Sequence, residues 1–175
     1  ARNVFAVCNA TAALEMTVQL ARLQRGDEVI IPSHTFTSSA YPFAKRGIKI
    51  VWADIDPKTR VLSPRTLIEQ ISPKTKAVVV VHLYGYGADM PEILEIAKTH
   101  KLVVIEDAAQ ALGVDIEEKK AGTFGDIGVF SFHSAKNITT LGEGGMLVVK
   151  DEEIAGQVPM LRHNGHCSFP FERED

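Results

Sequence analysis

Val78-Val79-Val80-Val81 is the stretch that decides the fold of this 175-residue chain. An unbroken run of β-branched residues is typical of a strand that is buried on both faces, inside a parallel sheet covered by helices. Similar short apolar runs alternate along the chain with segments of helical period. The strands that we expect cover residues 4–8, 28–31, 48–53, 77–83, 102–106, 129–132 and 146–149. The pattern predicts an α/β fold, built as three α/β/α layers with a mostly parallel sheet.

The segments between these strands carry helix signals. Apolar side chains recur at helical spacing over residues 11–24, and Gly26 is expected to end that helix. A second helix is predicted to open at Ser63-Pro64, because serine caps a helix and proline needs no donor at the first position. Asp89, three residues before a glutamate, has the spacing of a capping box before a third helix.

Composition and charge narrow the class of protein. With 45% hydrophobic and 23% charged residues, the chain resembles an average globular protein, and we expect one domain over residues 1–175. A formal charge of -3 without a basic run predicts no nucleic-acid partner. Two isolated cysteines and short apolar runs predict a cytoplasmic protein without a membrane span. The chain starts at Ala1 and enters an apolar run almost at once, so we expect a fragment of a longer protein.

Ligands of open α/β sheets bind at the carboxyl ends of the strands, so the residues after each strand are candidate site residues. Asn9-Ala-Thr-Ala-Ala13 follows the first strand and opens a helix with small side chains. Free amide donors and the positive end of the helix dipole meet at such a point, which makes it a plausible phosphate site. Asn9 or Thr11 could equally serve only as a helix cap.

Asp107 follows the predicted strand 102–106 and would place a carboxylate at the same edge. Opposite charges about 4 Å apart at an effective dielectric of about 20 attract by roughly 4 kcal/mol, which is enough to keep a pyridine nitrogen protonated. The alternative is that Asp107 caps the next turn of the chain.

Lys136 lies in a polar loop after the strand 129–132, and the glycine-rich stretch 142–145 follows it. Schiff-base chemistry needs an amine that loses its proton, and partial burial lowers the pKa of a lysine. Glycines would let the backbone pass close to a bound ring. Phe36, in the loop after the second strand, could lie against that ring. An ordinary solvated lysine and a core phenylalanine are the alternatives.

Eight blocks of sequence, taken in order and spacing, resemble the DegT/DnrJ/StrS sugar aminotransferases. The similarity covers nearly the whole chain and implies the large domain of a fold type I pyridoxal-phosphate (PLP) enzyme. The blocks are Asn9-Ala-Thr-Ala-Ala-Leu14, residues 26–32, Thr35-Phe36, His82-Leu-Tyr-Gly85, Ala88-Asp-Met90, residues 105–110, Phe124-Gly-Asp126, and Phe130-Ser-Phe132 with Lys136-Asn137.

The resemblance implies a role for each candidate residue. Lys136 would carry PLP as a Schiff base and shuttle the proton, while Asp107 would hold the pyridine nitrogen protonated. Glutamate would donate the amino group, and a nucleotide-linked keto-sugar would accept it. The remaining cofactor contacts implied are Gln110 at the phenolic oxygen, Phe36 on the ring, and Thr11, Ala12 and Ser131 at the phosphate.

The resemblance also implies features beyond these residues. Relatives are longer, carry a C-terminal domain and build each site across a homodimer interface. Ala10 replaces the usual glycine before the phosphate-binding Thr11, which is tolerable if its φ angle is negative.

Several alternative functions remain. Another fold type I PLP enzyme would share Lys136 and Asp107, and a sugar dehydratase would carry histidine in place of Lys136. A regulatory or inactive α/β module is the non-enzymatic alternative. Ser131 and His133 could suggest a hydrolase, but the sequence has no nucleophile elbow around them. A metal site is not expected, because the tight run His163, His166 and Cys167 offers poor geometry for three ligands.

Overall fold

The computed structural model describes residues 3–163 and residue 165. The strands of the main sheet are β1 (Asn3–Val7), β2 (Glu28–Pro32), β3 (Lys49–Ala53), β4 (Thr75–Val81), β5 (Val103–Asp107), β8 (Ile127–Ser131) and β9 (Gly145–Val149). The helices of four or more residues are α1 (Ala10–Leu20), α2 (Tyr41–Lys45), α3 (Pro64–Gln70), α4 (Met90–His100), α5 (Glu152–Ala155) and α6 (Val158–Arg162). Each predicted strand has a counterpart within a few residues.

The seven strands form one sheet in the order β1-β9-β8-β5-β4-β2-β3. Neighbours from β8 to β3 are parallel, and β9 runs antiparallel to both β8 and β1. The sheet is therefore mostly parallel, as predicted. Val78–Val81 lies in β4, near the middle of the sheet, and its four side chains are at most 5% exposed.

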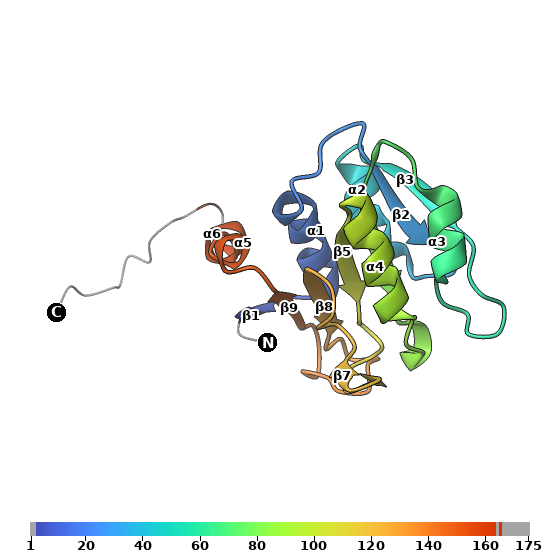
Figure 1. Ribbon diagram of the computed structural model, residues 1–175. Coiled ribbons are helices and arrows are strands. Elements are labelled where there is room, and N and C mark those ends of the chain that lie inside the picture. Colours follow the sequence, from blue (N-terminus) through green and yellow to red (C-terminus); the bar gives the residue numbers. More distant parts are fainter. Residues whose placement is uncertain (1–2, 164, 166–175) are drawn as a thin grey trace.

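The helices form one layer on each side of the sheet (Figure 1). Right-handed crossovers place a helix on one face when the chain moves one way along the sheet and on the other face when it returns. The connections through α1 and α2 run toward β3, whereas those through α3 and α4 run back toward β5. In agreement, α1 contacts α2 and α3 contacts α4, which completes the predicted α/β/α arrangement.

The predicted helix over residues 11–24 is shorter than expected. It ends at Leu20 because Arg22 adopts the left-handed conformation, with φ of 52°. The N–H of Leu23 then donates to Val18 O and that of Arg22 to Gln19 O, which is a Schellman motif. Gly26 lies in the following turn at φ of 97° and does not end the helix.

The other helix starts agree with the sequence. Ser63 caps α3 in a capping box with Pro64 in its first turn, and the Asp89 carboxylate accepts from the N–H of Glu92 at the start of α4. Lys101 ends α4 in the left-handed conformation at φ of 56°. Residue type alone does not identify Arg22 or Lys101 as such a position, because glycine usually occupies it.

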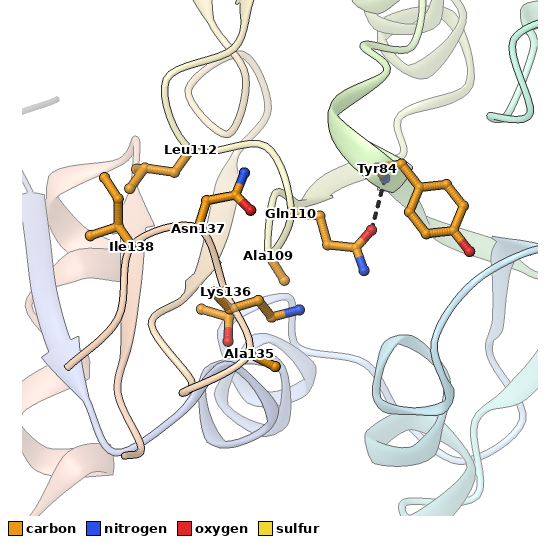
Figure 2. Close-up of a pocket in the computed structure, with 9 residues that line it drawn as sticks. Tyr84, Ala109, Gln110, Leu112, Ala135, Lys136, Asn137 and Ile138 are labelled. Carbon is orange, nitrogen blue, oxygen red and sulfur yellow. Dashed lines mark hydrogen bonds between the residues drawn. The ribbon is translucent and has the colours of Figure 1, made fainter. Parts of the chain in front are cut away.

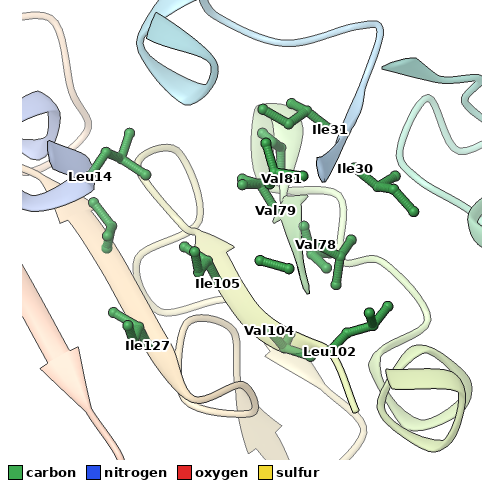
Figure 3. Packing of buried hydrophobic residues seen from close by; sticks show 14 of the residues in the cluster. Leu14, Ile30, Ile31, Val78, Val79, Val81, Leu102, Val104, Ile105 and Ile127 are labelled. Atoms are coloured by element: carbon green, nitrogen blue, oxygen red, sulfur yellow. The ribbon is translucent and has the colours of Figure 1, made fainter. Parts of the chain in front are cut away.

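The main core lies between the sheet and its helices. Figure 3 shows aliphatic side chains of β2, β4, β5 and β8 packed beside one another, together with Leu14 from α1. Burial of Val, Leu and Ile side chains stabilises such a core by about 1.5–3 kcal/mol per residue. The strand ends that carry the candidate site are therefore held by a well-packed sheet.

The sequence did not predict two further features. A short hairpin of β6 (Asp115–Ile116) and β7 (Lys119–Lys120) connects β5 to β8, and α5 and α6 follow β9 at the β1 end of the sheet (Figure 1). The Arg162 side chain joins α6 to the Ala6 carbonyl at 3.0 Å. Within the described residues, no helix is long and apolar enough to cross a membrane.

Candidate active site

A cavity of about 480 Å³ opens at the carboxyl edge of the sheet. It is lined by loops that follow β1, β2, β4, β5 and β8, which are far apart in sequence. Six of the seven predicted site residues line it, namely Thr11, Phe36, Asp107, Gln110, Ser131 and Lys136. A second cavity, of about 360 Å³, adjoins it and shares Gln110, Ser131 and Lys136.

Lys136 lies where the two cavities meet and is partly buried. Its backbone N–H donates to His133 O at 2.9 Å, which holds the loop after β8 in a turn. Figure 2 shows the side chain extending away from Asn137 and Ile138, toward the side of the pocket where Gln110 lies. The described residues contain no carboxylate within ion-pair distance of this amine.

Asp107 ends β5 and is 6% exposed. Its Oδ2 accepts a hydrogen bond from Ser39 Oγ at 2.6 Å, and its Oδ1 accepts from the N–H of Ala109 at 3.1 Å. The second contact is the turn cap that the sequence allowed. The first is not local, and Asp107 has no ion-pair partner in the part of the chain that the structure describes.

The start of α1 forms another wall of the cavity. Asn9 is the N-cap, and its Oδ1 accepts from the N–H of Ala12 at 2.9 Å. The N–H groups of Ala10 and Thr11, in the first turn, have no intrahelical acceptor, and the Thr11 hydroxyl donates to Ser38 Oγ at 2.9 Å. Ala12 does not line the cavity, and its N–H is occupied by the cap. Ala10 has a negative φ, as its replacement of glycine requires.

The side-chain amide oxygen of Gln110 is already hydrogen-bonded within the protein. The N–H of Tyr84 donates to Gln110 Oε1 at 2.7 Å (Figure 2). The amide nitrogen therefore remains as the end available to a ligand, and it can only donate. Tyr84 makes this contact from a left-handed conformation with φ of 55°.

Phe36 is 70% exposed and lines the cavity, so it is not a core residue. It precedes a 3-10 turn over Thr37–Ser39. Neighbouring His34 contacts the Tyr84 ring edge-on, with centroids 6.1 Å apart. Phe36 can thus present its ring face to a flat ligand.

The sequence did not predict the role of Glu106 and His82, which form buried hydrogen bonds next to the site at the ends of β5 and β4. Glu106 is fully buried, and its oxygens accept from the N–H groups of Gly122, Phe124 and Gly125 at 2.6–2.7 Å and from His82 Nε2 at 2.9 Å. His82 Nδ1 accepts from Ala88 N, so the ring is neutral with its proton on Nε2. An acidic residue inside a buried strand was the available signal.

Two glycines of the stretch 142–145 make close contacts within the protein. An added Cβ on Gly145 would lie 2.5 Å from the carbonyl carbon of Asn9, and one on Gly144 would lie 2.6 Å from Thr140 Oγ1. These two glycines allow close approach of protein atoms. Gly145 in particular lets the start of α1 pack against β9.

No group of three potential metal ligands occurs among residues 3–163 and 165. His166 and Cys167, which form a tight run with His163 in the sequence, lie outside the described residues. Ser131 accepts a contact from the His133 backbone N–H at 3.4 Å and not from its ring.

The fold and the cavity together define a class. An amine, a buried carboxylate and the start of a helix meet at the carboxyl edge of a doubly covered sheet, where α/β enzymes bind phosphorylated ligands. The fold is the three-layer fold of fold type I PLP aminotransferases, as the comparisons with known structures show.

The chain belongs to the DegT/DnrJ/EryC1/StrS aminotransferase family, whose model matches residues 1–173. It is 43% identical over 164 residues to GDP-perosamine synthase of Caulobacter vibrioides, covering 94% of this chain and 44% of that protein. The structure of S. venezuelae DesV in complex with a ketimine intermediate aligns with a TM-score of 0.90 at 34% identity, covering 98% of this chain and 46% of that one.

A third relative has another activity. E. coli GDP-4-keto-6-deoxy-D-mannose-3-dehydratase, solved with bound hydrated PLP, aligns with a TM-score of 0.84 at 30% identity over 89% of this chain and 41% of that one. The chain spans less than half the length of each of these relatives. Nearly the whole chain therefore matches the family, whereas more than half of the length of each relative has no counterpart in this chain.

Proposed function

We propose that this chain is the PLP-binding large domain of an aminotransferase that moves an amino group from glutamate onto a nucleotide-linked keto-sugar. The observation that carries the proposal is the convergence of Lys136 and Asp107 on one cavity from the ends of different strands. The family match supports the same reaction class.

The residues present fit the cofactor. Asp107 is a buried carboxylate without a cationic partner among the described residues, a costly arrangement that a protonated ring nitrogen would compensate. The start of α1 and Ser131 offer donors to a phosphate, and Phe36 offers a ring face. Gln110 Nε2 is a donor suited to a phenolate oxygen.

PLP, when bound, acts as an electron sink for the carbon that carries the amino group. Lys136 Nζ then supplies the amine for covalent attachment and holds or moves the proton at that carbon. Asp107 would hold the ring nitrogen of the cofactor in its protonated form, because opposite charges about 4 Å apart at an effective dielectric of about 20 attract by roughly 4 kcal/mol. The donors at the start of α1 retain the cofactor while Lys136 is free to act.

We further propose that the protein is cytoplasmic and works as a homodimer with shared active sites. Exposed Tyr84, Leu112 and Ile138 line the smaller cavity, and they would be covered by a second subunit or by further segments. Asn137 and Ile138 line the smaller cavity, which leaves room for the sugar substrate beside Lys136.

Covalent attachment of PLP tests the central assignment. The complete protein is loaded with PLP, reduced with borohydride and digested, and the modified peptide is located by mass spectrometry. We expect the label on Lys136, no label in Lys136→Ala, and normal labelling in the control Lys150→Ala, which removes an exposed lysine elsewhere. Labelling of Lys136→Ala to the same extent would exclude Lys136 as the attachment site.

A second experiment separates the alternatives. Glutamate alone should convert the absorbance of the loaded protein to that of the pyridoxamine form, and a keto-sugar nucleotide should reverse it. An inactive module would bind PLP without conversion, and a dehydratase would consume the sugar without accumulating an amino-sugar. Asp107→Asn should slow the conversion by a factor of up to about 1,000, which corresponds to roughly 4 kcal/mol of lost charge interaction.

A further inference from the structure

Ser39 is the only side chain that donates to Asp107 among the described residues, and it reaches that carboxylate from another loop. It is fully buried, 68 positions before Asp107 in sequence, and its Oγ lies 2.6 Å from Asp107 Oδ2. A carboxylate only accepts, so the Ser39 hydroxyl must be the donor. This contact determines which way one oxygen of Asp107 faces.

Thr35 extends the contact by one step. Its Oγ1 lies 2.7 Å from Ser39 Oγ, and either hydroxyl could donate by geometry. The single hydroxyl proton of Ser39 is already committed to Asp107, so Thr35 must be the donor. The three residues form a directed chain from Thr35 to Ser39 to Asp107, and each bond polarises the next.

The turn that carries Ser39 also carries two other cavity contacts. The backbone N–H of Ser39 donates to Phe36 O at 3.0 Å, and the hydroxyl of the preceding Ser38 accepts from the Thr11 hydroxyl. A single short turn after β2 therefore links the carboxylate, the exposed ring and the start of α1. Such a link between separate walls is what a preorganised site requires.

We infer that Ser39 and Thr35, which lie in the wall of the larger cavity, are positioning residues that orient the Asp107 carboxylate toward the cofactor ring. The inference rests on the proposed function and adds to it two residues outside the predicted site. Ser39 acts through Asp107, and Thr35 acts through Ser39.

The test measures the dissociation constant of PLP for the complete protein, with the melting temperature of the cofactor-free protein as a second readout. Loss of a hydrogen bond to a charged group should weaken binding about ten-fold in Ser39→Ala and less in Thr35→Val. Ser39→Thr keeps the hydroxyl and should restore tight binding. Thr17→Val is the matched control, because it removes a buried hydroxyl that bonds to Leu14 O, away from Asp107.

A double-mutant cycle distinguishes positioning from general stability. If Ser39 acts through Asp107, Ser39→Ala should weaken PLP binding in the wild-type background and have no effect in Asp107→Asn. An equal effect in both backgrounds, an effect of Thr17→Val as large as that of Ser39→Ala, or a lower melting temperature with unchanged affinity would each overturn the inference. Absence of PLP binding in the unmutated protein would instead refute the proposed function.

Discussion

Replacement of Glu106 by glutamine should destabilise the protein strongly, although the two side chains have nearly the same shape. In the structure Glu106 Oε1 accepts from the N–H groups of Phe124 and Gly125, and Oε2 accepts from Gly122 N–H and His82 Nε2. Glutamine has an NH2 group in place of one oxygen, and that group cannot accept. In either orientation, two donors lose their acceptor.

The magnitude follows from burial. Glu106 and His82 are 0% exposed, and Gly122, Phe124 and Gly125 are all buried, so water cannot replace the lost acceptor. An unsatisfied buried donor costs about 1–3 kcal/mol, so two of them should lower the free energy of unfolding by about 2–6 kcal/mol. That is a large part of the total stability of a typical domain, which is about 5–15 kcal/mol.

The assay is urea unfolding monitored by circular dichroism. Glu118→Gln is the control, because Glu118 is exposed. The control should change the free energy of unfolding by less than about 0.5 kcal/mol. A similarly small change in Glu106→Gln would refute the reasoning, because it would mean that these donors find other partners or are not buried in solution.

Three further predictions concern the strand edges and the site. Tyr84→Gly should raise the free energy of unfolding by up to about 1 kcal/mol, measured by urea unfolding, because it relieves a left-handed backbone. Gly145→Ala should displace the start of α1 and weaken PLP binding in equilibrium dialysis, whereas Gly142→Ala, with no atom within 4 Å, should not. The hydrogen bond from Lys49, and after it that from Ser72, lower the pKa of Glu28 below its ordinary value. The free energy of unfolding, measured in urea at several pH values, should therefore fall as the pH drops through that lowered pKa, and it should fall less steeply in Lys49→Met.

Much of the fold could be predicted because its determinants are local. Val78–Val81 indicates a doubly buried strand, and Ser63 and Asp89 mark helix starts through contacts within three residues. The helix end at Arg22 could not be predicted, because a left-handed arginine is stabilised by the surrounding chain and not by its own preference.

The residues of the candidate site also fall into those that the sequence predicted and those that only the structure showed. Asp107 and Lys136 were predicted because each follows a strand, and parallel strands bring their carboxyl ends to one edge. The role of Gln110 came from the resemblance to the family. Ser39 and Glu106 were not predicted, because their partners are distant in sequence or on the other face of a strand. The close approach of Gly145 to the backbone of Asn9 was not predicted either, because the two residues are far apart in sequence.

By itself the sequence determined that this protein alternates strands and helices, and that an amine, a carboxylate and a small-residue helix start follow three of its strands. Only the tertiary structure decided that β9 lies antiparallel between β1 and β8, and that Ser39 donates to Asp107 across 68 residues. The physical reason is range. Backbone preference and capping act over a few residues, whereas strand order and buried hydrogen bonds depend on which surfaces pack together once the core forms.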